Sequence, residues 1–180
     1  DRIEAPDRLI FDLDPDEGLG FAETKKAAFE MREALSDIGL QSTAMVTGGK
    51  GIHVIVPLKR TVRWETVKAF AKTFAHMMAE KDPERYIATM SKEKRKNRIF
   101  IDWLRNERGA TAILPYSPRA RPNAPVATPV TWEELDALQS AAAFTIGDME
   151  GRLKGKEPAL AVKPQTLGKA VIGRLEKRVG

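Results

Sequence analysis

The 180-residue sequence contains no cysteine and only two histidines. The absence of cysteine excludes disulfides, thiolate metal sites, iron–sulfur clusters and a cysteine nucleophile, and two histidines argue against a histidine-rich zinc site. No apolar run approaches the roughly 20 residues that a membrane-spanning helix needs, and no signal-peptide pattern opens the chain. We therefore expect one domain with an ordinary core in a reducing compartment, the cytoplasm, with no membrane partner.

Positive charge is concentrated in the middle of the chain. The whole sequence has a net charge of +5, whereas residues 81–121 alone hold eleven Lys or Arg and five Asp or Glu. A basic segment on a nearly neutral body is typical of proteins that bind a polyanion, either nucleic acid or a nucleotide. A solvated, lysine-rich helix or loop is the alternative.

The hydrophobic pattern predicts an α+β domain. Its order, strand–helix–strand–strand–helix–strand, is that of the ferredoxin-like or RNA-recognition-motif-like fold, βαββαβ. That fold has an antiparallel sheet with both helices on one face and the first strand between the third and the fourth. We expect Thr24 to cap the first helix and Gly39 to end it. The predicted strands are 8–13, 42–47, 51–56, 98–104 and a short one at 110–114, and the predicted helices are 24–38 and 63–80.

The C-terminal third is expected to be less regular. Prolines between 115 and 129 predict an extended loop that no helix can cross. Thr131 and Glu134 form a capping-box pattern that opens a short helix. We expect the domain to occupy residues 1–148, and residues 149–180 to be a basic tail or linker with a possible short helix at 166–178.

Strand parity places carboxylates on one face of the predicted sheet. If the large apolar residues face the helices, the open face receives Asp12 and Asp14 from the first strand, His53 from the third and Asp102 from the fourth. Ionised carboxylates this close repel each other, and a divalent cation is the usual solution. Their oxygen ligands favour Mg²⁺ or Mn²⁺ over zinc, and two such ions support in-line phosphoryl transfer. The alternative is that Asp14 merely starts a turn.

A glycine-rich turn joins the second and third predicted strands. Its backbone amides, with Thr47, Gly49, Lys50 and His53, could bind the phosphates of a nucleotide. It is not a P-loop, because the spacing is wrong and no helix follows. A hairpin turn that simply needs glycine is the alternative.

Basic residues are expected at the rim of the same face. The run from Ser91 to Arg98 leads directly into the strand of Asp102, and Arg119 and Arg121 follow in the proline-rich loop. Such charges suit the phosphates of a nucleic-acid backbone, and a guanidinium group suits phosphate oxygens in particular.

Four motifs resemble the polymerase domain of bacterial DNA ligase D, a member of the archaeo-eukaryotic primase superfamily that acts in non-homologous end joining. In order they are Phe-Asp-Leu-Asp-Pro at 11–15, Gly-Gly-Lys-Gly-Ile-His at 48–53, Arg-Ile-Phe-Ile-Asp-Trp-Leu-Arg-Asn at 98–106 and Pro-Tyr-Ser-Pro-Arg-Ala-Arg-Pro at 115–122.

The resemblance implies a template-directed nucleotidyltransferase that prefers ribonucleotides and uses two Mn²⁺ or Mg²⁺ ions. Its substrates would be NTPs or dNTPs and a DNA primer–template or broken DNA end, and a ligase module and the Ku protein would be partners near the nucleoid. By motif match, the catalytic metal ligands would be Asp12, Asp14 and Asp102. The nucleotide would be held by Thr47, Gly49, Lys50, His53, Arg119 and Arg121. The nucleic acid would be contacted by Lys92, Arg95, Arg98, Arg105 and Asn106.

Two departures from the family pattern are visible. Thr47 stands where the family usually has serine, and the retained hydroxyl predicts little change. The family's domain also has an N-terminal half ahead of the Asp-Leu-Asp-Pro motif, and that half is absent from this sequence. We therefore expect only the catalytic half of the domain here.

Two other functions use the same features. A nucleic-acid-binding module would need aromatic rings on the central strands for base stacking, but the open face is acidic there. A metal-dependent nuclease would use the same carboxylates but has no triphosphate for the turn to hold.

Overall fold

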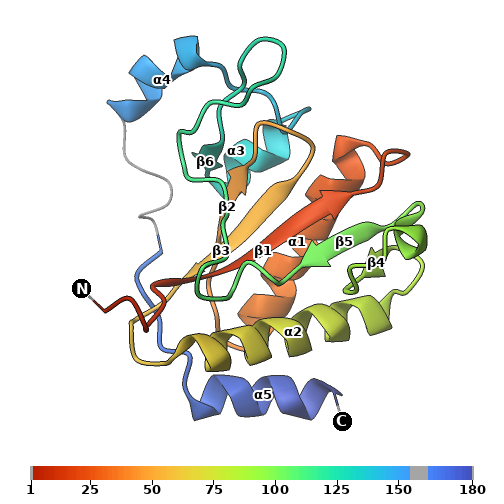
Figure 1. Cartoon of the computed structure of the whole chain (residues 1–180), viewed down its shortest axis with the longest axis vertical. Coiled ribbons are helices and arrows are strands. Elements are labelled where there is room, and N and C mark those ends of the chain that lie inside the picture. The colour runs from red at the N-terminus through yellow and green to blue at the C-terminus, as the bar shows by residue number, and fades with distance from the viewer. Residues whose placement is uncertain (1, 155–161, 180) are drawn as a thin grey trace.

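The computed structural model describes residues 2–154 and 162–179 (Figure 1). In this part of the chain, a six-stranded sheet has the order β4-β5-β1-β3-β2-β6. The predicted central place of the first strand is confirmed, because β1 lies between β3 and β5. The elements are β1 (Arg8–Pro15), α1 (Phe21–Asp37), β2 (Thr43–Val46), β3 (Ile52–Pro57), α2 (Trp64–Lys81), β4 (Tyr86–Ile87), the 3-10 turn η1 (Glu93–Arg95), β5 (Ile99–Asp102), β6 (Thr128–Val130), α3 (Trp132–Ala137), α4 (Ile146–Leu153) and α5 (Lys169–Val179).

The sheet is mixed, whereas the sequence pattern predicts an antiparallel one. The two-residue strand β4 pairs in parallel with β5, and the remaining pairs are antiparallel. The pattern misses both β4 and β6, because two or three residues are too few to show alternation. The expected short strand at 110–114 is wrong, since this stretch is irregular.

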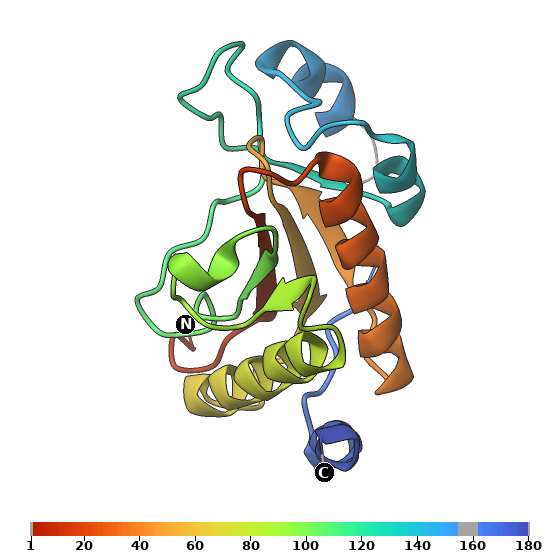
Figure 2. The same ribbon diagram turned by 90° about the vertical axis from the view of Figure 1, so that its right-hand side faces the viewer.

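Both long helices pack on one face of the sheet (Figure 2), as the alternation predicts. Leu9, Phe11 and Leu13 of β1 are fully buried beneath them. The ring of Phe11 lies 5.1 Å from that of Phe74 on α2. Burial of each such side chain contributes about 1.5–3 kcal/mol to the stability of the fold. The three buried side chains therefore hold β1 in its register within the sheet.

The helix ends agree only partly with their predicted signals. α1 begins at Phe21, three residues before Thr24, which is buried inside the helix and donates its hydroxyl to the Gly20 carbonyl oxygen at 3.4 Å. The expected cap at Thr24 is therefore wrong. The left-handed end at Gly39 is confirmed by its φ of +85°. The capping box of α3 is also confirmed, with the Thr131 hydroxyl accepting from the Glu134 amide at 3.1 Å.

The connection from β5 to β6 runs across the sheet face that the long helices leave open (Figures 1 and 2). It carries the proline-rich loop and hydrogen-bonds to itself, as when the Tyr116 amide donates to the Ala127 carbonyl oxygen and the Arg119 amide to that of Pro125. The connection therefore covers part of the open face, and some of its residues form one wall of a pocket.

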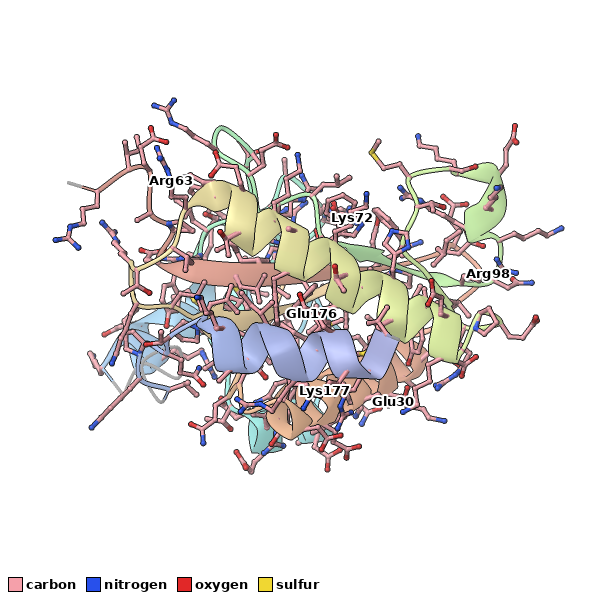
Figure 3. All side chains as sticks on the ribbon, turned by 90° about the horizontal axis from the view of Figure 1, so that it is seen from below. Glu30, Arg63, Lys72, Arg98, Glu176 and Lys177 are labelled. Carbon is pink, nitrogen blue, oxygen red and sulfur yellow. The ribbon has the colours of Figure 1, made fainter. Side chains whose placement is uncertain are left out.

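The C-terminal helix, α5, packs on the helical layer. α4 spans residue 148, where we expected the domain to end, and α5 lies beside α2 (Figure 3). Val171 and Leu175 of α5 join the buried cluster, and the Arg174 Nε donates to the Ile38 carbonyl oxygen at 2.7 Å. The part of the expected tail at 155–161 lies outside the described residues. None of the helices in 2–154 and 162–179 combines the length and apolar character that a membrane crossing requires.

Candidate active site

The three predicted carboxylates lie on two neighbouring strands. In the ladder, Asp12 of β1 is directly opposite Asp102 of β5 on one side and His53 of β3 on the other. Asp14 lies two residues further along β1, opposite Phe100. The Asp14 side chain is 58% exposed, whereas the Asp102 side chain is only 10% exposed. The three carboxylates and His53 thus share the sheet face opposite the long helices, as the period-2 alternation predicts.

The environment of Asp14 and Asp102 disfavours the ionisation of these two carboxylates. Burial raises the pKa of Asp14, and the negative charge of Asp12 raises it further. Burial also raises the pKa of Asp102, although the Leu104 amide and the Arg105 guanidinium partly offset that effect. A cluster that holds unfavourable negative charge is suited to receive a cation.

Two arginines already approach these carboxylates. The Arg105 Nη2 lies 3.0 Å from the Asp102 Oδ2, and its Nε lies 3.9 Å from the Asp12 Oδ2. The Arg95 Nη1 lies 3.8 Å from the Asp14 Oδ2. The Arg95 guanidinium also covers the Phe100 ring at 3.8 Å from its centre. That ring is therefore not free to stack on a base, which argues against the nucleic-acid-binding module.

The donor set has the chemistry that a hard divalent cation prefers, although the described side chains are not yet close enough together to hold one. Among the described residues, no three His, Asp or Glu side chains converge closely enough to hold a metal ion. Asp12, Asp14 and Asp102 nevertheless offer only carboxylate oxygens on adjacent strands, which is the chemistry that Mg²⁺ and Mn²⁺ prefer. These three residues would hold the metal, provided that the arginine contacts give way.

His53 is the buried neighbour of the cluster. Its Nε2 lies 3.4 Å from the Asp12 Oδ2. Its Nδ1 is buried and has no hydrogen-bond partner among the described residues. The imidazole therefore lies against one side of Asp12 in a buried position.

The glycine-rich turn is closed by Thr47. Its amide and its hydroxyl both donate to the Gly51 carbonyl oxygen, at 3.2 and 3.0 Å. Gly48 has a φ of +68°, which favours glycine, and a Cβ there would lie 2.9 Å from the Cγ of Arg119. The Arg119 Nη1 in turn donates to the Thr47 carbonyl oxygen at 2.9 Å. The hairpin interpretation of the glycines and the phosphate-binding one are thus compatible.

A pocket of about 570 Å³ brings the turn, the carboxylates and the arginines together. Sequence reasoning missed one of its walls, residues 111–113, which it assigned to a strand. A loop that crosses a sheet by tertiary packing leaves no periodic signal. The lining residues are Asp12, Asp14, Thr47, Gly49, Lys50, Gly51, His53, Arg105, Thr111, Ala112, Ile113, Arg119 and Arg121.

The expected nucleic-acid contacts fall into different environments. Lys92 is exposed beside η1, and Arg98 is half-buried where β5 begins. Asn106 is only 1% exposed, and its amide is committed to the backbone of Ile10 and Trp103. This burial corrects the expectation that Asn106 contacts DNA, because no part of its side chain is offered to a ligand.

A family model described as the LigD primase-polymerase domain matches residues 1–160. The chain belongs to the LigD primase-polymerase family. The "Multifunctional non-homologous end joining protein LigD" of Pseudomonas aeruginosa is 40% identical over 151 residues, which are 84% of this chain and 18% of that protein. The "Bifunctional non-homologous end joining protein LigD" of Bacillus subtilis is 29% identical over 150 residues, 83% of this chain and 24% of that protein. The chain thus spans under a quarter of these LigD relatives.

A solved LigD structure has the same fold. The polymerase domain of Mycobacterium tuberculosis ligase D, in complex with DNA, superimposes with a TM-score of 0.77 and 36% sequence identity. The match covers 83% of this chain and 52% of that one. The α+β fold of the LigD polymerase domain, expected from the motifs, is thereby confirmed.

Proposed function

We propose that this chain is the catalytic half of a template-directed nucleotidyltransferase that extends DNA ends in non-homologous end joining, with a preference for ribonucleotides. One observation carries the proposal. A single pocket joins the carboxylates of Asp12 and Asp14, with Asp102 directly across the ladder, to the glycine-rich turn, which would bind a triphosphate. A nuclease needs the carboxylates but not the turn, so the combination favours nucleotide addition.

The basic and the acidic residues of the pocket would have different roles. Lys50, Arg119 and Arg121 line the pocket on the side of the turn, where they would hold the phosphates of the incoming NTP or dNTP. Asp12, Asp14 and Asp102 would hold two Mn²⁺ or Mg²⁺ ions, which would activate the attacking primer hydroxyl and offset charge on the leaving pyrophosphate. His53 would support Asp12 from the neighbouring strand, where its Nε2 lies 3.4 Å from the Asp12 Oδ2.

The nucleic acid would approach along the basic rim. Lys92 and Arg98 lie near the end of β5 that is remote from Asp102, and Arg95 lies beside Asp14. Contacts of this kind bind phosphates without reading sequence, which suits DNA ends of any sequence. A ligase module, the Ku protein and a location at the nucleoid belong to this proposal and rest on the family alone.

The test is a titration of Mn²⁺ and a ribonucleoside triphosphate into the chain, followed by primer extension on a gel. We expect Asp12→Ala to abolish metal-dependent nucleotide binding. Asp136→Ala, an exposed acid on α3, is the matched control and should bind as the wild type does. Lys50→Ala should weaken nucleotide binding more than DNA binding, and the control Lys81→Ala on α2 should change neither.

The outcomes separate the alternatives. Extension that is lost in Asp12→Ala establishes nucleotide addition by this chain. Metal-dependent nucleotide binding without extension means that the pocket works and DNA must be presented by a further segment. Shortening of the primer would favour the nuclease, and binding that Asp12→Ala leaves intact would refute the metal assignment.

A further inference from the structure

Arg105 lies between the two carboxylates that face each other across β1 and β5. Its Nη2 is 3.0 Å from the Asp102 Oδ2, and its Nε is 3.9 Å from the Asp12 Oδ2. Its Nη1 also donates to the Thr111 carbonyl oxygen at 3.2 Å, in the loop that walls the pocket. One guanidinium thus reaches both carboxylates and the pocket wall.

The two carboxylates need such a partner when no metal is bound. Like charges directly opposite each other on paired strands destabilise a sheet. Asp12 and Asp102 are opposite each other in this way. Because Asp102 is buried, water screens the repulsion between the two charges only weakly. A planar guanidinium with several N–H donors can interact with both at once.

The backbone beside Arg105 is anchored, whereas its side chain is not. The Asn106 Nδ2 donates to the Ile10 and Trp103 carbonyl oxygens at 2.7 and 2.8 Å, and its Oδ1 accepts from the Ile10 amide at 2.8 Å. Asn106 thus continues the ladder of β1 past the last residue of β5. The Arg105 side chain is 38% exposed, so it can leave the carboxylates while its backbone stays in place.

We propose that Arg105 is a built-in counter-cation for Asp12 and Asp102, which a divalent cation must displace. The inference rests on the proposed function, because it concerns the same carboxylates. It replaces the expectation that Arg105 contacts DNA. In the metal-free chain, the Arg105 side chain then occupies the position beside the two carboxylates. It moves away from them when a divalent cation binds.

The experiment measures Mn²⁺ binding to the chain by calorimetry, without nucleotide or DNA. Arg105→Gln removes the competing cation, so Mn²⁺ should bind about fivefold more tightly, as expected from a partly exposed ion pair. Arg119→Gln is the matched control, because Arg119 lines the same pocket but hydrogen-bonds the Thr47 carbonyl oxygen instead of a carboxylate. A general effect of removing one positive charge would appear equally in both variants.

A second measurement uses thermal unfolding. Without metal, Arg105→Gln should melt below the wild type, since it removes the cation that lies against both carboxylates. Mn²⁺ should raise its melting temperature more than that of the wild type. If Arg105→Gln does not fold, Arg105→Lys replaces it. An ammonium is a single point charge and cannot bridge two carboxylates as a guanidinium does, so Mn²⁺ should bind about twofold more tightly than to the wild type.

The two proposals fail in different ways. Saturable Mn²⁺ binding by the wild type, with no greater gain in Arg105→Gln than in Arg119→Gln, overturns the counter-cation and leaves the proposed function standing. Absence of Mn²⁺ binding in the wild type and in Arg105→Gln overturns both, because the carboxylates then hold no metal. A gain confined to Arg105→Gln supports both.

Discussion

Gly51 is the position where one added methyl group should damage both the fold and the site. A Cβ there would lie 2.9 Å from the Leu13 carbonyl oxygen and 3.2 Å from the Asp12 Oδ1. The first of these is a backbone atom of the central strand, opposite Ile52 in the ladder, so no side-chain rotation relieves the contact. The second is a proposed metal ligand. Gly51→Ala must therefore push the start of β3 away from β1, and the added methyl group crowds the Asp12 carboxylate as well.

The expected magnitude follows from the cost of overpacking. Inserting a methyl group into a site with no free space typically costs about 1–3 kcal/mol. For a domain of this size, each kcal/mol lowers the melting temperature by about 2–4 °C, so we expect a loss of about 2–12 °C. Mn²⁺ binding should weaken as well, because the Asp12 Oδ1 is one of the atoms that the methyl group meets.

Gly49→Ala is the matched control within the same turn. A Cβ at Gly49 would have its nearest neighbour, the Thr47 Oγ1, at 3.5 Å, which is ordinary contact. Gly49 is also not among the described glycines with a positive φ. We expect its stability to stay within about 0.5 kcal/mol of the wild type, as for most changes without a specific clash.

The assay is urea denaturation and thermal unfolding of the wild type and both variants, with Mn²⁺ titrated into each. Equal stability of Gly51→Ala and Gly49→Ala would refute the steric argument. A destabilised Gly51→Ala that binds Mn²⁺ with unchanged affinity would show that β3 moves and Asp12 does not.

Three further predictions concern other positions. Gly48→Ala should lose about 1–3 kcal/mol in urea denaturation and bind nucleotide more weakly, because its φ of +68° is unfavourable for alanine and its Cβ would meet Arg119. Asp14 has a raised pKa, so its ionisation opposes folding. Asp14→Asn should therefore be about 0.3 kcal/mol more stable than the metal-free wild type at neutral pH, a small gain because Asp14 is largely exposed. That gain should vanish in acid, where Asp14 is protonated in both folded and unfolded chains, as melting curves at the two pH values would show. Tyr86→Phe should cost about 1 kcal/mol in urea denaturation, since the hydroxyl donates to Glu30 on the helical side, and it should leave nucleotide addition unchanged.

Each of these has an outcome that contradicts it. Wild-type stability in Gly48→Ala would mean that the turn relaxes without strain. An advantage of Asp14→Asn that persists in acid would have a source other than the ionised carboxylate. Loss of nucleotide addition in Tyr86→Phe would connect the helical side to the pocket, which no contact described above does.

The elements whose apolar residues recur with the period of a strand or a helix could be predicted from the sequence. Alternation along β1, β3 and β5 placed Asp12, His53 and Asp102 on one face, and the ladder sets them side by side. Helix stripes located α1 and α2 for the same reason, since each pattern spans many residues of one element. α4 was missed although it has a local signal, the capping box of Thr145 and Asp148.

Other features have no local signal. β4 and β6 are strands only because longer strands are beside them. Asn106 belongs to a run of polar and charged residues in the sequence, yet the return of the chain after β5 buries it against Ile10. The start of α1 at Phe21 rather than at Thr24 likewise cannot be predicted from the capping preference of one residue.

The sequence by itself determined which face of the sheet carries the carboxylates, because side chains of a strand alternate and the apolar ones must be buried. It also determined the family, through motifs whose residue types and order are specific. Only the tertiary structure decided that Arg105 lies between Asp12 and Asp102, that Asn106 is structural, and that residues 111–113 close the pocket. These arrangements depend on how a long irregular connection packs across the sheet, and packing between segments distant in sequence leaves no trace in the local pattern.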